Sequence, residues 1–583
     1  MEMSIFFVDC IPVERVQKRT KQAANGTCFV LVYCKMSKIL AYFKKMLYLC
    51  TRNRELGFKC LFTCTIQNFA RKIPQISKKI QHLGKKSIGF LHISKKYCNF
   101  AQIFKAMQKL IGREREIKEL ERCLASEQSE FVIVYGRRRV GKTFLVDEFF
   151  HGKYDFTYVG GHKLSVKKQL RNFAKAMMRH AQLPKQPKFN DWSEAFDALI
   201  AHIESLPEER KKVIFIDEMP WIDTPLSDFV EEFENFWNGW AARRRDIMLI
   251  ASGSATSWMM DNLIENQGGL HCRITSNIYL RPFTLHETEL YLRERKCAWD
   301  RYQIVQAYMI LGGVPFYWSL LDTKQSLVQN IDRLFFQRNA ILNIEFDELF
   351  NALFSNADRY IQVVQLLANN KEGLTRSQIG KGLNVDGKTL TTVIKNLTRC
   401  DFILRYNQLG NTVKDAIYRL SDFYTLFYLQ YVHSNNSLDE KWWSKHFMSH
   451  GVESWQGRTY ELVCMLHTDA IKRKLGISGI GTDISSWRYT PAKDSGEKGA
   501  QIDMLISRDD RVINVCEMKF AVGKYQMTSA YADYLRDRVE LFKAKTKTRY
   551  SVVQTMVTTY GVAEGVNSGI VQQEIVMDDL FAL

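Results

Sequence analysis

The chain has 583 residues, 13 of them cysteine, and a formal net charge of +19. This length allows several domains, and the scattered cysteines exclude a disulfide-rich secreted scaffold. The positive charge suggests a nucleic-acid function, but residues 1–106 carry 20 Lys and Arg against 4 Asp and Glu, which leaves 62 against 59 for the rest. The charge therefore says little about the partners of the remaining chain.

The first 106 residues differ from everything that follows. They hold seven of the 13 cysteines, and lysines interrupt every apolar run before it could cross a bilayer. No signal peptide is recognisable, because Glu2 and Asp9 flank the first apolar patch. A basic Cys-rich accessory domain and sequence upstream of the true start are the two alternatives. We favour the second, with the natural protein starting at or near Met107, and expect a cytoplasmic protein without a membrane segment.

A phosphate loop is the clearest motif. Residues 131–135 are apolar strand formers, residues 136–143 read GRRRVGKT, and a helix is expected to follow. A loop between strand and helix turns backbone N–H groups and the positive end of the helix dipole toward one anion, a context that a chance match would lack. We expect Lys142 to reach the β- and γ-phosphates of ATP and the Thr143 hydroxyl to bind Mg²⁺. The residues expected to bind the nucleotide here are Gly136, Arg137, Arg138, Arg139, Val140, Gly141, Lys142 and Thr143.

A second, acidic strand supplies groups that hydrolysis needs. Residues 213–216 indicate a buried parallel strand, and Asp217 and Glu218 stand at its carboxyl end, where ligands bind in open α/β sheets. We expect Asp217 to hold Mg²⁺ through water and Glu218 to polarise the attacking water. Taken alone, the pair could equally be an ordinary strand-end turn. A third strand, 247–252, leads to Ser254, a candidate sensor of the γ-phosphate.

Five sequence boxes occur in this order: IGRERE (111–116), GRRRVGKT (136–143), FIDEMPW (215–221), ASGSATSWM (251–259) and LGGVPFYW (311–318). With them the chain resembles the archaeal-type ATPases of the AAA+ and STAND-like P-loop group. The resemblance covers roughly residues 107–583 and implies a five-stranded parallel sheet followed by a small helical lid. In that family an arginine near the last core strand can sense the γ-phosphate. Arg273 matches by position, and a surface arginine is the alternative.

We expect an ATPase core at 107–284, a helical lid at 285–350 and a third unit at 351–430. In the third unit, three predicted helices precede two short strands, the pattern of a winged helix-turn-helix. Its last helix would offer DNA the residues Lys388, Thr391, Thr392 and Lys395. A protein-docking module is the alternative, because the positive charge of this unit is thin.

The last unit, 431–583, contains a polar hairpin. Its strands, 501–506 and 512–520, are joined by a charged turn. Folding the hairpin about the centre of that turn places Asp503 opposite Glu517, with both side chains on one face. Two facing carboxylates are suitable ligands for a hard divalent cation.

Two further residues extend this pair. Lys519 points to the same face as Glu517 and would steady the charge that develops on a phosphodiester, while Glu461 adds a third carboxylate from a preceding helix. The pattern resembles the PD-(D/E)XK nuclease fold, although Ile502 replaces the proline of that name. The resemblance implies a metal site made by Glu461, Asp503 and Glu517, and an ordinary hairpin ion cluster is the alternative.

The expected fold is therefore α/β: a P-loop parallel sheet with a helical lid, then a winged helix-turn-helix, then an α/β restriction-endonuclease-like domain. Two function classes compete. In the first, ATP binding or hydrolysis controls metal-dependent cleavage of DNA, with Lys142, Glu218 and Lys519 as catalytic residues. In the second, the ATPase is a nucleotide-operated switch whose C-terminal domains bind DNA or a protein partner without cleavage. ATP and Mg²⁺ are the expected cofactors, and a homo-oligomer is compatible with both classes.

Overall fold

The computed structural model describes residues 110–207, 210–265, 268–270, 272–354, 356–385, 387–410, 416–492 and 498–582, which belong to the compact unit Ala101–Leu583. The expectations for residues 1–106 and for a start at Met107 lie outside the described residues. Within these described ranges, no helix is both long and apolar enough to cross a membrane.

A five-stranded parallel sheet opens the described chain. Its spatial order is β2-β3-β4-β1-β5, and every neighbouring pair is parallel. The strands are β1 (Glu130–Tyr135), β2 (Phe156–Val159), β3 (Lys212–Asp217), β4 (Ile247–Gly253) and β5 (Ser276–Tyr279). All residues of β1, β3 and β4 are buried, as in sheets that helices cover on both faces. The expectation of a five-stranded parallel sheet is confirmed.

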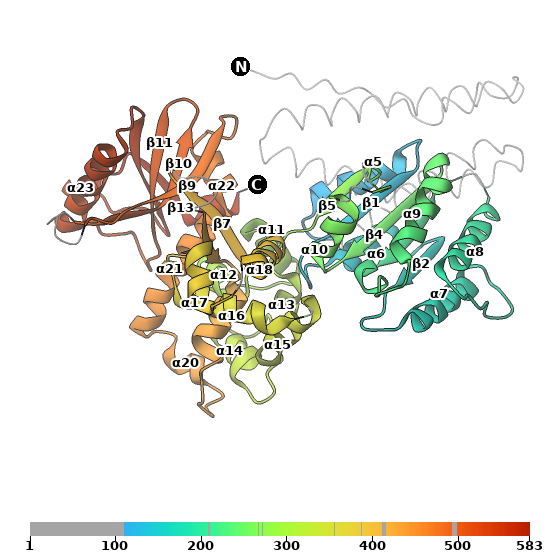
Figure 1. The fold of residues 1–583 in the computed structure, drawn as a ribbon. Coiled ribbons are helices and arrows are strands. Elements are labelled where there is room, and N and C mark those ends of the chain that lie inside the picture. Colours follow the sequence, from blue (N-terminus) through green and yellow to red (C-terminus); the bar gives the residue numbers. More distant parts are fainter. Residues whose placement is uncertain are drawn as a thin grey trace, which may run out of the picture. The chain divides into compact units, whose positions relative to one another are not determined.

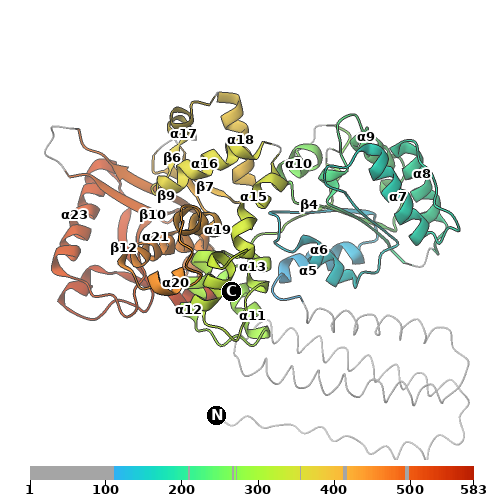
Figure 2. The ribbon, with the colours of Figure 1, turned by 90° about the horizontal axis from the view of Figure 1, so that it is seen from below.

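Alternate residues of the strands pack on opposite faces of this sheet. Phe131 and Ile133 pack with α7, α8 and α9, whereas Val132 and Val134 pack with α5 and α6. Figure 2 shows these two groups of helices on either side of β4. The helices are α5 (Glu114–Ala125), α6 (Lys142–Phe150), α7 (Val166–His180), α8 (Trp192–Glu204) and α9 (Phe229–Gly239). Shorter helices are η1 (Met219–Trp221), η2 (Ala241–Arg243), α10 (Thr256–Met259) and η3 (Met260–Ile264).

Helices alone follow β5, in the stretch where the sequence predicts a lid. Local signals start them: Thr284 with Glu287 forms a capping box for the first, and Asp300 with Gln303 forms another for the second, each satisfying N–H groups that a helix start leaves unpaired. The helices are α11 (Leu285–Glu294), α12 (Arg301–Leu311), α13 (Pro315–Ser319), α14 (Leu327–Ile331), η4 (Asp332–Phe336) and α15 (Ile341–Leu353).

A three-helix unit with a small antiparallel sheet comes next. Its elements are α16 (Ala357–Asn369), β6 (Leu374–Thr375), α17 (Arg376–Leu383), α18 (Gly387–Arg399), β7 (Ile403–Gln408) and β8 (Ile417–Leu420). Strand β8 pairs antiparallel with both β6 and β7. Thr375 caps α17, and Gln378 completes its capping box. The two-residue strand β6 was not predicted.

The remaining chain adds five strands to the same sheet. They are β9 (Thr482–Tyr489), β10 (Ala500–Arg508), β11 (Val512–Lys519), β12 (Ser551–Thr558) and β13 (Gln573–Val576). Strands β9, β10 and β11 are antiparallel neighbours, whereas β12 runs parallel to β11 and β13 runs parallel to β12. Because β7 pairs in parallel with β9, one eight-stranded sheet of order β13-β12-β11-β10-β9-β7-β8-β6 results.

Helices cover both faces of the C-terminal strands. α23 packs on one face with Trp487 and Val515, as Figure 1 shows beside β11, and α21 packs on the other with Cys516 and Met518. The helices of this part are α19 (Phe423–Phe427), η6 (Tyr428–Val432), α20 (Trp442–His446), α21 (His450–Leu466), α22 (Thr468–Lys474), α23 (Ser529–Thr546), η7 (Val566–Ile570) and η8 (Met577–Phe581).

A single hydrophobic cluster runs from Leu285 to Phe581 through all three of these later parts. It includes residues on both sides of positions 350 and 430, where the sequence analysis places domain boundaries. Those boundaries stay predictions, but the parts that they separate share one core.

His467 ties the first lid helix to α21 inside this core. Its Nε2 accepts the backbone N–H of Leu285, the first residue of α11, at 3.0 Å, and its Nδ1 lies 2.8 Å from the carbonyl oxygen of Val463. The ring is therefore neutral, with the proton on Nδ1. Burial lowers the pKa of His467 to about 4, although the Val463 carbonyl favours the charged form.

We predict that His467 lowers the free energy of unfolding as the pH falls below neutrality. The folded pKa is depressed, so the unfolded chain binds the extra proton between pH 6.5 and pH 4, and stability present above pH 6.5 is lost as pH falls. The loss between pH 7 and pH 5 is about 2 kcal/mol. Urea unfolding should show a smaller pH dependence for His467→Gln, while His450→Gln, at an exposed position, should behave like the wild type. Equal pH dependence in all three proteins would contradict this.

Candidate functional site

The phosphate loop joins β1 to α6 as the sequence predicts. Gly136 has φ 145°, and a Cβ there would lie 2.4 Å from the carbonyl oxygen of Leu280, so only glycine fits. Gly141 has φ 94° and precedes α6 without any side-chain cap, which leaves the backbone N–H groups at the start of this helix available to an anion. Val140 between them is buried and anchors the loop, and its carbonyl oxygen lies 3.4 Å from Arg113 of the IGRERE box.

Lys142 lies beneath this loop. The side chain is 5% exposed, and its Nζ donates to the carbonyl oxygens of Gly136 and Arg137, both at 3.1 Å. Burial lowers the pKa of Lys142, and the carboxylates of Glu218 and Asp217 oppose this shift. A buried ammonium held only by carbonyl groups is suited to bind phosphate oxygens in their place.

Two hydroxyl groups contact Asp217 at the end of β3, one from the start of α6 and one from the end of β4. Thr143 Oγ1 donates to Asp217 Oδ2 at 2.8 Å, and Ser252 donates to Asp217 Oδ1. Burial raises the pKa of Asp217, although the hydrogen bond from Ser252 acts in the opposite direction. A buried carboxylate beside a hydroxyl fits a Mg²⁺ site. Ser252 was not predicted. Its position at the carboxyl end of β4, the strand beside β3, could have indicated it.

Glu218 is held by Ser254 beyond the end of β3. Its backbone adopts φ 48°, and its Oε2 accepts the backbone N–H of Ser254 at 3.1 Å and the Ser254 hydroxyl at 2.8 Å. Ser254 is 1% exposed. In this structure Ser254 therefore orients the carboxylate, and its role as a γ-phosphate sensor stays a prediction.

The arginine side chains of the phosphate loop contact residues of the later helices and of the segment before α19. Arg137 is 2% exposed and pairs with both oxygens of Asp422, one contact measuring 3.1 Å. Its guanidinium also lies 4.7 Å from the centre of the Phe402 ring. Burial alone would lower the pKa of Arg137, but the Asp422 carboxylate raises it above its ordinary value.

The other two loop arginines also contact the lid. Arg139 pairs with the buried carboxylate of Glu345 and lies 4.3 Å from the centre of the Phe316 ring. Arg138 lies 3.5 Å from the carbonyl oxygen of Glu348. The expectation that residues 137–139 bind the nucleotide stays a prediction. In this structure their side chains have partners on α13, α15 and just before α19.

Arg273 is not joined to the phosphate loop. Its side chain is exposed and forms no hydrogen bond or ion pair with any described residue. Its role in sensing the γ-phosphate stays a prediction beside the alternative of a surface arginine.

Helix α18, the expected DNA reader, packs against the segment that follows β4. Lys395 pairs with Asp261 at 3.0 Å, and Arg399 pairs with Glu265 at 2.6 Å. Lys395 thus has a partner within the protein while its side chain stays exposed, and its role in DNA binding stays a prediction. The other residues of this helix that would face DNA are also exposed: Lys388, Thr391 and Thr392.

The C-terminal hairpin has the predicted register. Its paired residues run from Ser507 and Ile513 to Met504 and Cys516, so the next position in the same register carries Asp503 and Glu517. A bulge interrupts the pairing of β10 with β9 at this point. The two carboxylates therefore stand where the ladder between their strands ends, and bulges of this kind redirect side chains.

Glu517 is surrounded by cationic side chains. Lys519 Nζ lies 2.8 Å from its Oε1, Arg538 Nη1 lies 2.7 Å from its Oε2, and the Tyr531 hydroxyl donates to Oε1 at 2.5 Å. Burial opposes ionisation, but the charges of Arg538 and Lys519 lower the pKa of Glu517 to about 2. Arg538 and Tyr531 were not predicted, because they lie on α23 and no pattern in the hairpin sequence indicates that this helix packs against it.

The other two carboxylates have different partners. Glu461 is 3.6 Å from Arg419, and burial, reinforced by the charge of Asp503, raises its pKa to about 7. Asp503 accepts a hydrogen bond from Gln501 at 2.7 Å. Among the described residues, no three His, Cys, Asp or Glu side chains are placed to hold a metal ion together. The expected ligand set is thus in one neighbourhood but not assembled, since Glu517 is committed to Arg538 and Lys519.

Comparison with known proteins identifies the N-terminal part. Residues 110–321 match the family of ATPase domains found predominantly in Archaea. The chain is 25% identical over 335 residues to the uncharacterized protein MJECL04 of Methanocaldococcus jannaschii, covering 57% of this chain and 70% of that one. It is 42% identical over 43 residues to the uncharacterized ATP-binding protein MJ0423 of the same organism, covering 7% and 73%.

Two solved structures are also similar. The Walker-type ATPase PABY2304 of Pyrococcus abyssi shows 18% identity and a TM-score of 0.40, with 55% of this chain and 95% of that one covered. The ORC2 protein of Aeropyrum pernix, solved in ADPNP–ADP complexes, shows 15% identity and a TM-score of 0.34, with 55% and 93% covered. The family match, rather than these distant likenesses, shows that residues 110–321 form an archaeal-type ATPase domain.

We predict that the ion pair of Arg137 with Asp422 stabilises the protein strongly. Arg137→Ala leaves the buried Asp422 carboxylate without its cation, which should lower the free energy of unfolding by about 3–5 kcal/mol. Arg138→Ala removes an arginine with a single long contact in the same loop and should cost less than about 1 kcal/mol. Urea titrations of both variants test this, and equal small effects would contradict it.

Proposed function

We propose that this protein is an ATP hydrolase whose nucleotide state controls a DNA-binding C-terminal half. The ATPase family match supports hydrolysis. The observation that carries the control is the buried pairing of Arg137, inside the phosphate loop, with Asp422 of the C-terminal half. A loop that closes on phosphates cannot shift without affecting this pair.

The phosphate loop and the residues around it fit ATP and Mg²⁺. Backbone N–H groups at the start of α6 face the loop, and bound Mg²⁺-ATP would supply the phosphoryl group and the divalent charge. Lys142 would exchange its two carbonyl partners for the β- and γ-phosphate oxygens. Thr143 and Asp217, whose Oγ1 and Oδ2 atoms are 2.8 Å apart, would hold the cation. Glu218 would accept a hydrogen bond from the attacking water once its carboxylate leaves Ser254.

DNA binding is proposed for the three-helix unit. The order of its elements, a helix, a short strand, two helices and a two-stranded wing, is that of a winged helix-turn-helix. Recognition helices read DNA with their N-terminal residues. In α18 those are Lys388, Thr391 and Thr392, which are exposed, while Lys395 and Arg399 near its end pair with Asp261 and Glu265. This division lets α18 contact DNA at one end and the ATPase domain at the other.

Cleavage of nucleic acid is a second candidate. It is favoured by the order α21, α22, β9, β10, β11, α23, β12, which resembles the PD-(D/E)XK fold, with Asp503 and Glu517 at the point where two strands separate. The carboxylates as they stand do not fit a divalent cation, because Arg538 and Lys519 hold Glu517. Metal-dependent cleavage would first require Glu517 to leave these two cations.

The ATPase assignment is tested at Lys142 and Glu218. Lys142→Ala should lower ATP turnover by about 10²-fold or more and weaken ATP binding, because the charge that faces the phosphates is lost. Glu218→Gln should retain binding and lose turnover. Lys153→Ala, which removes an exposed lysine beyond α6, is the matched control. Turnover that survives unchanged in Lys142→Ala would rule the assignment out.

The second candidate is tested at Asp503. If the C-terminal centre cleaves DNA, the wild type should nick labelled DNA with Mg²⁺ or Mn²⁺, and Asp503→Ala should abolish this while ATP turnover continues. Asp509→Ala, in the exposed turn of the same hairpin, should cleave normally. If the wild type cleaves no DNA with either metal and its melting temperature does not respond to Mn²⁺, the cleavage candidate is wrong. The protein is then a nucleotide-operated switch that does not cleave DNA.

A further inference from the structure

A basic pocket lies between the three-helix unit and α21. The end of α16, strand β8, the segment α19–η6 and α21 supply its walls, and its volume is ≈ 70 Å³. Such a volume holds a few waters or one tetrahedral anion, not a whole nucleotide. Three of the residues that line it are cations, Lys371, Arg419 and Arg458, and none is Asp or Glu.

Of these three cations, only Arg419 has a carboxylate partner among the described residues. It pairs with Glu461 at 3.6 Å and donates to the carbonyl oxygen of Arg458 at 3.4 Å. Arg458 donates to the neutral hydroxyl of Ser454 at 2.6 Å, and the ammonium of Lys371 makes no hydrogen bond or ion pair with the described residues. Converging positive charges repel one another and favour a bound anion.

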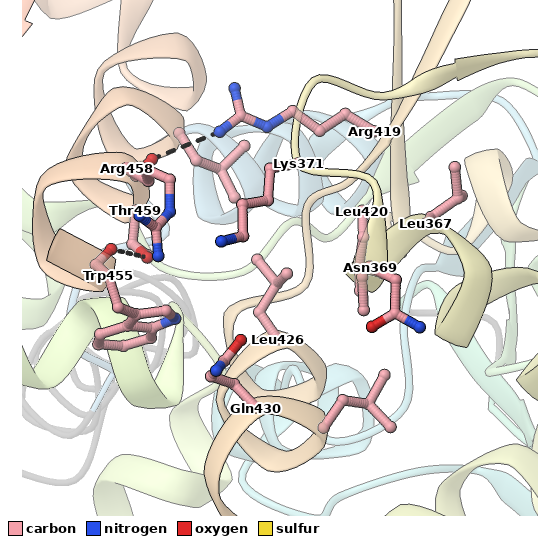
Figure 3. Close-up of a pocket in the computed structure, with 13 residues that line it drawn as sticks. Leu367, Asn369, Lys371, Arg419, Leu420, Leu426, Gln430, Trp455, Arg458 and Thr459 are labelled. Atoms are coloured by element: carbon pink, nitrogen blue, oxygen red, sulfur yellow. Dashed lines mark hydrogen bonds between the residues drawn. The ribbon is translucent and has the colours of Figure 1, made fainter. Parts of the chain in front are cut away.

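The shape of the pocket points to phosphate. In Figure 3 the charged ends of Lys371, Arg419 and Arg458 lie on one side of the pocket, while Leu367 and Leu420 lie on the other. Planar guanidinium groups bind two oxygens of a phosphate at once, and an ammonium adds a point charge. The apolar side lowers the local dielectric and strengthens both interactions.

The position of the pocket indicates which phosphate. Arg458 and Glu461 are three residues apart on α21, and Arg419 of the pocket lies 3.6 Å from Glu461, so the pocket borders the candidate cleavage centre. We infer that the pocket binds a backbone phosphate of a DNA strand whose neighbouring phosphodiester lies at Glu461. This inference rests on the proposed DNA binding and adds the place where the strand is held.

We call the site formed by Lys371, Arg419 and Arg458 the phosphate seat. Arg419 connects it to the neighbouring carboxylate of Glu461. A phosphate in the seat competes with Glu461 for the Arg419 guanidinium, because both are anions at the same side chain. A strand phosphate in the seat therefore weakens the pairing of Glu461 with Arg419.

The test is DNA affinity as a function of salt, measured on the full chain with an oligonucleotide in single- and double-stranded form. Arg458→Gln and Lys371→Gln should each weaken binding by about 5-fold and lower the salt slope by about one, irrespective of sequence. Arg458→Lys should retain part of the affinity. Arg536→Gln removes an exposed arginine from α23 and is the matched control. ATP turnover and the melting temperature should stay at wild-type values in all of these variants.

The outcomes separate this inference from the function on which it rests. Wild-type protein that binds neither form of DNA at low salt overturns both. DNA binding that Arg458→Gln and Lys371→Gln leave unchanged overturns the phosphate seat alone. The pocket could instead bind free phosphate. Inorganic phosphate would then raise the melting temperature of the wild type but not of Arg458→Gln, and the variant would bind DNA as the wild type does. This result would also contradict the inference.

Discussion

The ion pair between Arg137 and Asp422 is the contact that the rest of the structure depends on. Both side chains are almost completely buried, and two such charges are stable inside a protein only while they stay paired. Asp422 also accepts the backbone N–H of Thr425 at 3.1 Å and so caps α19. The phosphate loop and the start of a C-terminal helix are therefore fixed to the same carboxylate.

Strand β8 extends this connection to the other candidate sites. Arg419 lies on β8, three residues before Asp422, and belongs to the phosphate seat. The same sheet continues through β7 and β9 to the hairpin with Asp503 and Glu517. A movement of the phosphate loop that displaces Asp422 would thus be transmitted to Arg419 of the phosphate seat through a short, packed segment. Coupling between two sites is carried by such contiguous packed contacts.

Local patterns predicted much of this protein, and long-range partners could not be predicted. Residues 136–143 followed from the phosphate-loop motif between a strand and a helix. The place of Asp217 followed from the rule that ligands bind at the carboxyl ends of parallel strands, and the hairpin register followed from its turn. The partner of Arg137 is 285 residues away and nothing near the loop indicates it. Arg538 reaches Glu517 from a separate helix in the same way. The four-residue strands β2 and β5 were not located because so few residues show no period.

Hydrogen exchange of the full chain, with and without a non-hydrolysable ATP analogue, tests the central claim of coupling most directly. The account predicts that the analogue changes the exchange of two regions in the wild type, the phosphate loop and the backbone around Thr425 in α19. In Asp422→Asn, only the loop should respond. A wild type in which the analogue protects the phosphate loop and leaves α19 unchanged would contradict the account.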